Sequence, residues 1–170
     1  MMNIKDMQEK IDNDVKKEID DFFNFLHSEK SNEELNFIRI LLEIESLIDQ
    51  TLELVLPNSK VILDNKNLYL IDKTTILESL NILTHEDKIL ILNLNSLRNK
   101  CAHRRNYQIS ISDIKSLFSS MRFQTNPIFS KEVLPSINKK EYKSAYILIF
   151  AEFLKMFLRE KYKIIAIKSI

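Results

Sequence analysis

The stretch LNSLRNKCAHRR, residues 94–105, joins regularly spaced apolar residues to a cluster of polar and basic ones. Apolar side chains recur at three- and four-residue intervals, the spacing of one helix face, at Leu90, Leu94, Leu97 and Cys101. At about 100° per residue, a different face, more than a quarter-turn away, carries Asn95, Asn99 and Ala102. The stretch therefore predicts a helix that packs into a core on one side and meets another molecule on the other.

The basic residues are arranged around this second face. Arg98 and His103 flank it and lie about 140° apart around the helix axis, too far apart to grip one phosphate easily. Two arrangements would bring such side chains together. Either the helix frays or tightens at His103, or a second copy of the chain supplies complementary groups.

The segment Arg98-Asn99-Lys100-Cys101-Ala102-His103 resembles the ribonuclease motif of the HEPN domain family, an arginine followed after four to six residues by a histidine. Asn99, directly after the arginine, also fits that pattern. The detailed match covers the dozen residues 94–105, and the rest of the chain agrees in helical character and size. The resemblance implies a metal-independent ribonuclease that works as a homodimer, often as a toxin or phage-defence effector.

The chemistry of RNA cleavage explains why these residue types matter. The 2′-hydroxyl of RNA can attack the adjacent phosphorus, so a protein has to move protons and stabilise charge on the phosphate. Histidine suits proton transfer near neutral pH, and arginine offers a planar, permanently charged set of donors, which makes His103 and Arg98 the candidate catalytic residues. Supporting or RNA-binding roles fall to Asn99, Lys100, Arg104 and Arg105.

Two carboxylates earlier in the chain are candidates for orienting these groups. Glu45 and Asp49 lie one turn apart at the edge of an apolar helical stripe. A partly buried acid needs a partner, so either carboxylate could hold Arg98 or orient His103. The alternative is that both form a solvated edge of their helix.

Helical periodicity predicts an all-α, up-and-down bundle of four to six helices in a single domain, residues 1–170. Apolar spacing, capping residues and prolines place these helices at about 4–27, 31–56, 74–83, 84–104, 112–122 and 138–166. Residues 61–71 break the pattern, and either a small β-hairpin or an ordered loop with a short helical piece fits them. The polar stretch 124–135 is expected to be a mobile connection.

Composition excludes several classes of binding site. The chain contains no glycine, which P-loops and dinucleotide-binding fingerprints require for close backbone approach. Cys101 is the only cysteine, so neither an intrachain disulfide nor a cysteine-based zinc site can form. The three histidines also lack metal-ligand spacing. We therefore expect a protein without a metal or another cofactor.

Charge is distributed unevenly along the chain, although the net charge is only +1. Residues 1–87 carry 9 lysines and arginines against 19 acids, whereas residues 88–170 carry 16 against 5. Such polarity suggests either a polyanionic partner at the basic end or head-to-tail packing of the two halves. The longest apolar run is too short and too charged for a bilayer, and the start does not resemble a secretory signal, so we expect a cytoplasmic protein without membrane contact.

The residues and the resemblance together predict a metal-independent endoribonuclease that uses 2′-hydroxyl attack. It would act as a homodimeric toxin or defence effector, restrained by an antitoxin protein. The alternative is a catalytically inactive helical module for interaction or regulation, either antitoxin-like or similar to mannitol-repressor proteins, although no helix-turn-helix pattern supports DNA binding. Tyr107 is either a platform for an unpaired RNA base or an ordinary packing residue.

Overall fold

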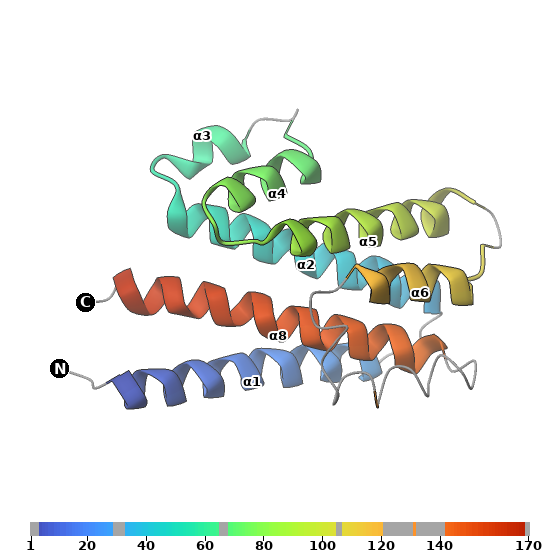
Figure 1. The fold of residues 1–170 in the computed structure, drawn as a ribbon, viewed down its shortest axis with the longest axis horizontal. Helices are drawn as coiled ribbons and strands as arrows, with labels where there is room; N and C mark the ends of the chain where they lie inside the picture. Colours follow the sequence, from blue (N-terminus) through green and yellow to red (C-terminus); the bar gives the residue numbers. More distant parts are fainter. Residues whose placement is uncertain are drawn as a thin grey trace.

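The computed structural model describes residues 4–28, 33–64, 68–104, 107–120, 131 and 142–168. Within these ranges the chain forms seven helices and no strand, which confirms the predicted all-α bundle with one helix more than expected (Figure 1). The helices are α1 (Ile4–Ser28), α2 (Glu33–Val55), α3 (Ser59–Leu63), α4 (Leu70–Ser79), α5 (His85–His103), α6 (Ile111–Ser119) and α8 (Tyr142–Lys168).

Helix α2 is the centre of the bundle. It contacts α3, α4, α5 and α8, while α1 packs on α8, and α6 packs against both α5 and α8. Figure 1 shows α1 and α8 antiparallel along one side of the molecule, with α2 and α5 also antiparallel to each other above them. Helix α4 lies over only part of this second pair, so the C-terminal part of α5 extends beyond it.

The core is a continuous apolar cluster to which all the long helices contribute. Ile48 and Leu52 on α2 and Ile91 on α5 have no exposed surface. Phe22 of α1 and Phe150 of α8 lie with their ring centroids 5.1 Å apart. Burying one large apolar side chain stabilises a fold by about 1.5–3 kcal/mol, so this cluster is the main source of stability.

Part of the charge asymmetry is neutralised where α1 packs against α8. Arg159 Nη2 lies 3.0 Å from Asp12 Oδ1. The hydroxyl of Tyr162 donates to Glu18 Oε1 at 2.6 Å, and burial together with this bond raises the pKa of Tyr162. In this helix pair, an acid of the first half of the chain is thus paired with a base of the second half.

The region between α2 and α4 contains a short helix where the sequence also allowed a β-hairpin. Asn58 adopts a left-handed backbone with φ 56° after Pro57, and α3 begins directly after it. Helix α4 begins at Leu70, ahead of the predicted start at Thr74. The Thr74 hydroxyl donates to the Leu70 carbonyl at 2.9 Å, a bond within the helix and not a cap. The hairpin is therefore wrong, and the short helical piece is confirmed.

The other helix boundaries lie close to their predicted positions. Helix α5 ends at His103, as the sequence indicated, and α1 and α2 end within a residue of their expected ends. The predicted cap at Ser31 lies outside the described residues, as does the predicted mobile connection 124–135 apart from Lys131. None of the helices in the described ranges combines the length and the apolarity that a bilayer crossing requires.

Candidate functional site

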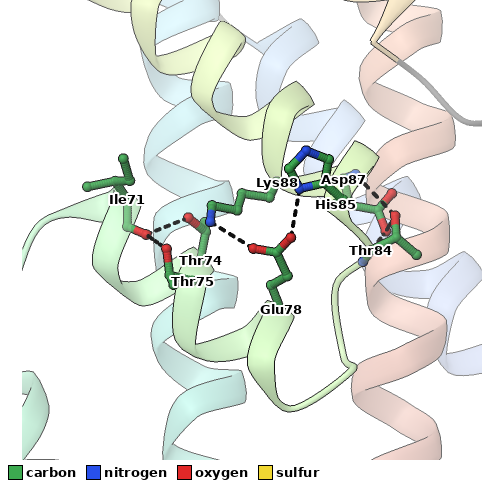
Figure 2. Close-up of polar contacts among 8 residues, drawn as sticks. All are labelled: Ile71, Thr74, Thr75, Glu78, Thr84, His85, Asp87 and Lys88. Carbon is green, nitrogen blue, oxygen red and sulfur yellow. Dashed lines mark hydrogen bonds and ion pairs between the residues drawn. The ribbon is translucent and has the colours of Figure 1, made fainter.

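Helix α5 carries the segment 98–103, and a capping box fixes its start. The Thr84 hydroxyl accepts a hydrogen bond from the Asp87 backbone N–H at 3.2 Å. In return, Asp87 Oδ2 accepts from the Thr84 backbone N–H at 3.0 Å and from its hydroxyl at 2.7 Å (Figure 2). These bonds satisfy N–H groups that would otherwise lack partners, and they confirm the predicted cap.

Polar contacts hold helix α4 against both α2 and α5. Glu78 accepts from Lys88 Nζ at 2.7 Å and lies 2.8 Å from His85 Nδ1 (Figure 2). The hydrogen bonds from Lys88 and His85 lower the pKa of Glu78. On the other side of α4, Lys73 Nζ donates to Asp49 Oδ2 of α2 at 2.8 Å. These contacts place α4 beside the first turns of α5 and the C-terminal half of α2.

The predicted two-faced character of α5 is confirmed. Its inner stripe is at most 3% exposed at Leu90, Leu94 and Leu97, and Cys101 packs against the edge of the core. On the other face, Asn95 is half-buried, whereas Asn99 and Ala102 are exposed. The helix thus presents small and polar groups outward along its last turns.

Beyond the end of α4, this outer face of α5 lies beside α2. Asn95 is seven residues after Lys88, so it lies on the same side of α5, two turns further along. Leu42 is seven residues before Asp49 and lies two turns along the same side of α2. Helices α2 and α5 are antiparallel (Figure 1). The path from Lys88 to Asn95 on α5 and the path from Asp49 to Leu42 on α2 therefore both run away from α4 in the same direction. Leu42, which is 50% exposed, and Asn95 therefore share one face that no described helix covers.

Arg98 and His103 both project from the end of α5. Arg98 is half-buried and its Nη1 donates to Asn99 Oδ1 at 3.0 Å, whereas His103 is exposed. Within the described ranges neither residue is paired with a carboxylate. The Arg104 N–H donates to the Lys100 carbonyl at 3.0 Å, so the last turn keeps α-helical spacing and neither frays nor tightens. In one chain, the two side chains consequently leave the helix about 140° apart.

The basic residues beside this pair have different environments. Lys100 Nζ lies 3.0 Å from Asp113 Oδ1, so its charge is compensated by α6. Arg104 is exposed, and its extended backbone, φ −106° and ψ 113°, ends the helix. Arg105 lies outside the described residues. Of the three predicted RNA-binding cations, the structure thus presents Arg104 to solvent and gives Lys100 a partner within the chain.

The two candidate orienting acids lie on α2, in the half of that helix that accompanies the start of α5. Asp49 binds Lys73 of α4, a partner that sequence reasoning did not foresee. Glu45 is half-buried one turn nearer the start of α2. The structure brings neither carboxylate into a described hydrogen bond or ion pair with Arg98 or His103.

Asp113 on α6 is the residue of this region that sequence reasoning missed. Its Oδ2 accepts from the Ser110 N–H at 2.9 Å, the Ser110 hydroxyl at 2.6 Å and the Tyr107 hydroxyl at 2.6 Å. Its Oδ1 accepts from Lys100 Nζ at 3.0 Å. One carboxylate therefore connects α5, the segment that follows it and the start of α6. The available signal was the capping-box spacing of Ser110 and Asp113.

Electrostatics favour a charged Asp113 and a neutral Tyr107. Burial by itself would raise the pKa of Asp113, but hydrogen bonds from Ser110, Tyr107 and Lys100 outweigh it and lower the pKa to about 2. Burial and the bond to Asp113 raise the pKa of Tyr107 to about 12. Tyr107 also packs against the core, so of its two predicted roles the structure shows the packing role.

The pockets between these helices include two with polar or charged linings. One of about 230 Å³ between α5 and α6 has a polar lining that includes Asn93 and Ser96. A larger one of about 410 Å³ between α1, α2 and α8 is lined in part by Glu18, Glu43 and Lys161. There, burial and the negative charge of Glu18 raise the pKa of Glu43. In the part of the chain that the structure describes, no group of three or more histidine, cysteine or acidic side chains could hold a metal ion.

The end of α5 therefore offers a guanidinium and an exposed imidazole that no described carboxylate neutralises. A guanidinium can bind phosphate oxygens through two parallel hydrogen bonds, and an imidazole can exchange protons with a neighbouring hydroxyl. The exposed Arg104 adds positive charge beside them. Comparison with protein-family models, curated proteins and solved structures finds no match for this chain.

Proposed function

We propose that the chain is a cytoplasmic, metal-independent endoribonuclease of the HEPN type that acts as a homodimer. The observation that carries the proposal is the end of α5, where Arg98 and an exposed His103 lie on a regular helix without a described carboxylate partner. The two residues have the spacing that the family motif requires. We extend the proposal to a toxin or phage-defence role in which an antitoxin protein restrains the nuclease.

In the proposed reaction, the 2′-hydroxyl of one nucleotide attacks the adjacent phosphorus, and the bond to the 5′-oxygen of the next nucleotide breaks. His103 takes part in the proton transfers that these two oxygens require. Arg98 stabilises the negative charge that accumulates on the phosphate oxygens in the transition state. The products are a 2′,3′-cyclic phosphate and a 5′-hydroxyl, and no water molecule is consumed in this step.

A second copy of the chain resolves the divergence of the two side chains. Because α5 is regular up to His103, one helix does not direct both groups toward one phosphate. In a two-fold dimer, Arg98 of one protomer can face His103 of its partner. The uncovered face of α2 and α5 supports this arrangement, since Leu42 supplies apolar surface and Ala102 allows a close approach.

The neighbouring residues have supporting roles in this proposal. Asn99 accepts a hydrogen bond from Arg98 and thereby limits the orientations of the guanidinium. Arg104 and Arg105 bind the RNA backbone, largely without sequence preference, because phosphate contacts carry no base information. Lys100 was also predicted to bind the RNA backbone, but its ion pair with Asp113 makes its ammonium group less available to a phosphate.

The test is cleavage of a labelled single-stranded RNA in EDTA by the full chain. The native protein is expected to leave 2′,3′-cyclic phosphate ends. Arg98→Ala and His103→Ala are each expected to lower kcat/KM at least about 100-fold, the usual effect of losing a proton-transfer group or a charge-stabilising donor. His85→Ala is the matched control, because it removes an exposed histidine from the opposite end of the same helix.

Each outcome of this test bears on a different part of the proposal. Cleavage that persists unchanged in both site variants contradicts the assignment of Arg98 and His103. A folded native protein that cuts no RNA contradicts the nuclease itself. Circular dichroism of every variant separates loss of activity from loss of structure.

A catalytically inactive interaction module is the second candidate. It is favoured by large apolar side chains that are exposed away from the end of α5, since Val61 is 77% and Tyr69 is 67% exposed. Such surface is typical of sites where another protein binds. This candidate predicts binding to a protein partner without RNA cleavage by the native chain.

A further inference from the structure

Asp113 differs from an ordinary helix cap because it binds groups outside its own helix. Asp72 provides the comparison, since its carboxylate accepts from the Tyr69 backbone N–H at 2.9 Å at the start of α4. Asp113 makes the equivalent backbone bond at the start of α6, also at 2.9 Å. In addition it binds Lys100 of α5 and Tyr107 of the connecting segment.

These two additional partners lie on either side of His103 along the chain. Lys100 is three residues before His103 in the last turn of α5, and Tyr107 is four residues after it. The side chain of Asp113 is only 8% exposed, so its bonds are better shielded from water than those of a surface ion pair. One carboxylate at the start of α6 is thus bonded both to the last turn of α5 and to Tyr107.

The same contact changes the role of Lys100. Its ammonium group lies 3.0 Å from Asp113 Oδ1 and 6.0 Å from the centre of the Tyr107 ring. A cation whose charge is already compensated releases fewer counterions when it approaches RNA, so it adds little to phosphate binding. Lys100 is thus better placed to support the turn than to bind substrate.

We propose that Asp113 is a positioning residue for the site at the end of α5, and that it holds the turn carrying His103 through Lys100 and Tyr107. The catalytic consequence of this inference rests on the proposed nuclease function. The ordering of the turn does not, because it follows from contacts within the chain.

The first measurement is backbone hydrogen exchange of the full chain, which needs no RNA. Asp113→Asn is expected to speed the exchange of amides 100–104 and 107–110 by about tenfold, because it weakens several bonds to a charged group. Asp72→Asn is the matched control and should leave these amides unchanged, since it removes only the equivalent cap of α4. Equal exchange of these amides in the two variants would overturn the proposal.

A milder variant keeps this test valid if Asp113→Asn does not fold. Tyr107→Phe removes one hydrogen bond to the carboxylate and leaves the cap of α6 intact. It is expected to speed exchange of the same amides by a smaller factor, about threefold. No change in these amides would count against the proposal.

The second measurement separates positioning from RNA binding. Asp113→Asn is expected to lower kcat about tenfold and to change KM less than about twofold, because the reacting groups are displaced while the exposed cations remain. In binding experiments at several salt concentrations, Lys100→Met should keep the native slope of log affinity against log salt. Arg104→Ala should reduce that slope by about one. An equal reduction for Lys100→Met would show that Lys100 binds RNA phosphate and would overturn its assigned role.

Failure of this inference can be told apart from failure of the proposed function. A native chain that cuts no RNA contradicts the nuclease and, with it, the expected effect of Asp113 on cleavage. A native chain that cuts RNA, with Asp113→Asn as active as Asp72→Asn, removes only the positioning role.

Discussion

Asparagine takes up a backbone conformation in this chain that glycine adopts in most proteins. Asn81 has φ 56° just after α4, and its N–H donates to the Glu78 carbonyl at 2.9 Å. The next N–H, of Ile82, donates back to the Leu77 carbonyl at 3.0 Å. Together these bonds form a Schellman motif, which needs a left-handed residue at this position. Since the chain contains no glycine, asparagine is the residue that tolerates it best.

Substitutions at Asn81 test this conformation. Asn81→Gly is expected to raise the free energy of unfolding by up to about 1 kcal/mol, whereas Asn81→Ala lowers it by about 1 kcal/mol. Urea denaturation measures both. The control is Asn13→Gly on the exposed side of α1, where glycine costs conformational entropy and should destabilise the protein. A loss of stability in Asn81→Gly would contradict the interpretation.

The low pKa of Asp113 makes its contribution to stability depend on pH. The carboxyl has an ordinary pKa of 3.8 in the unfolded chain and about 2 in the fold, so the unfolded state binds the proton more tightly. The stabilisation is therefore complete well above pH 3.8 and disappears as the pH falls toward about 2.

Denaturation at several pH values checks this expectation. The difference in unfolding free energy between the native chain and Asp113→Asn should be constant from about pH 5 to pH 7 and should shrink between about pH 4 and pH 2. Asp72→Asn serves as the reference series, because the bond given for Asp72 among the described residues is the cap at the start of its own helix. An Asp113→Asn difference that is as large near pH 2 as at neutral pH would show that the carboxylate charge is not responsible.

At the scale of whole elements, the cap of α5 can be altered without touching the other end of the helix. Thr84→Ala is expected to lower the free energy of unfolding by about 1–2 kcal/mol, because it removes the side-chain partner of an N–H group. RNA cleavage at a temperature where the variant is folded should stay unchanged, since His103 lies at the far end of α5.

The matched control for this cap is Thr75→Ala. The Thr75 hydroxyl donates to the Ile71 carbonyl at 2.7 Å within α4 (Figure 2), so its removal should change stability by less than about 0.5 kcal/mol. An equal loss in both variants would mean that the Thr84 hydroxyl has no special role as a cap.

The elements also show which features can be predicted from the sequence. The cap at Thr84 and the leucine stripe of α5 depend on residues within two turns of each other, so local spacing was sufficient to find both. Thr74 and Ser112 misled the prediction because a hydroxyl near a helix start is ambiguous. The Thr74 hydroxyl bonds within α4, and the Ser112 hydroxyl lies 2.7 Å from Ser110 Oγ, whose residue is the actual cap of α6.

Some features of the candidate site could likewise be predicted from the sequence, and others could not. The positions of Arg98 and His103 on one helix follow from periodicity, and the exposure of His103 agrees with its place off the inner stripe. The partners of Lys100 and Asp49 do not follow, because both ion pairs join helices whose relative placement is decided by packing. Sequence spacing contains no information about which acid a long lysine side chain will reach.

At the scale of the whole molecule, the homodimer that we propose depends on the uncovered face of α2 and α5. Leu42→Glu is expected to convert the homodimer into a monomer, because it places a charge within the apolar part of the interface. Sedimentation equilibrium measures the mass, and cleavage should fall together with the fraction of dimer. Ile89→Glu is the control, since Ile89 is 38% exposed on a different side of α5.

Three results are distinguishable in this experiment. A native mass of one chain at all concentrations contradicts the homodimer, and a Leu42→Glu variant that stays dimeric contradicts this interface. If Ile89→Glu also sediments as a monomer, the result would indicate that any added acid dissociates the protein.

The arrangement of α1 and α8 has a consequence for anything joined to the chain. Helix α1 begins and α8 ends at the same end of the bundle, and α5 ends at the opposite one (Figure 1). The 27 residues of α8 measure about 40 Å at 1.5 Å per residue. A fusion partner attached near Ile4 or Lys168 therefore needs a tether of about a dozen extended residues to touch the imidazole of His103. A fluorophore or an affinity handle attached there directly leaves the end of α5 unobstructed, whereas an inhibitory domain fused there would need a tether of that length to reach His103.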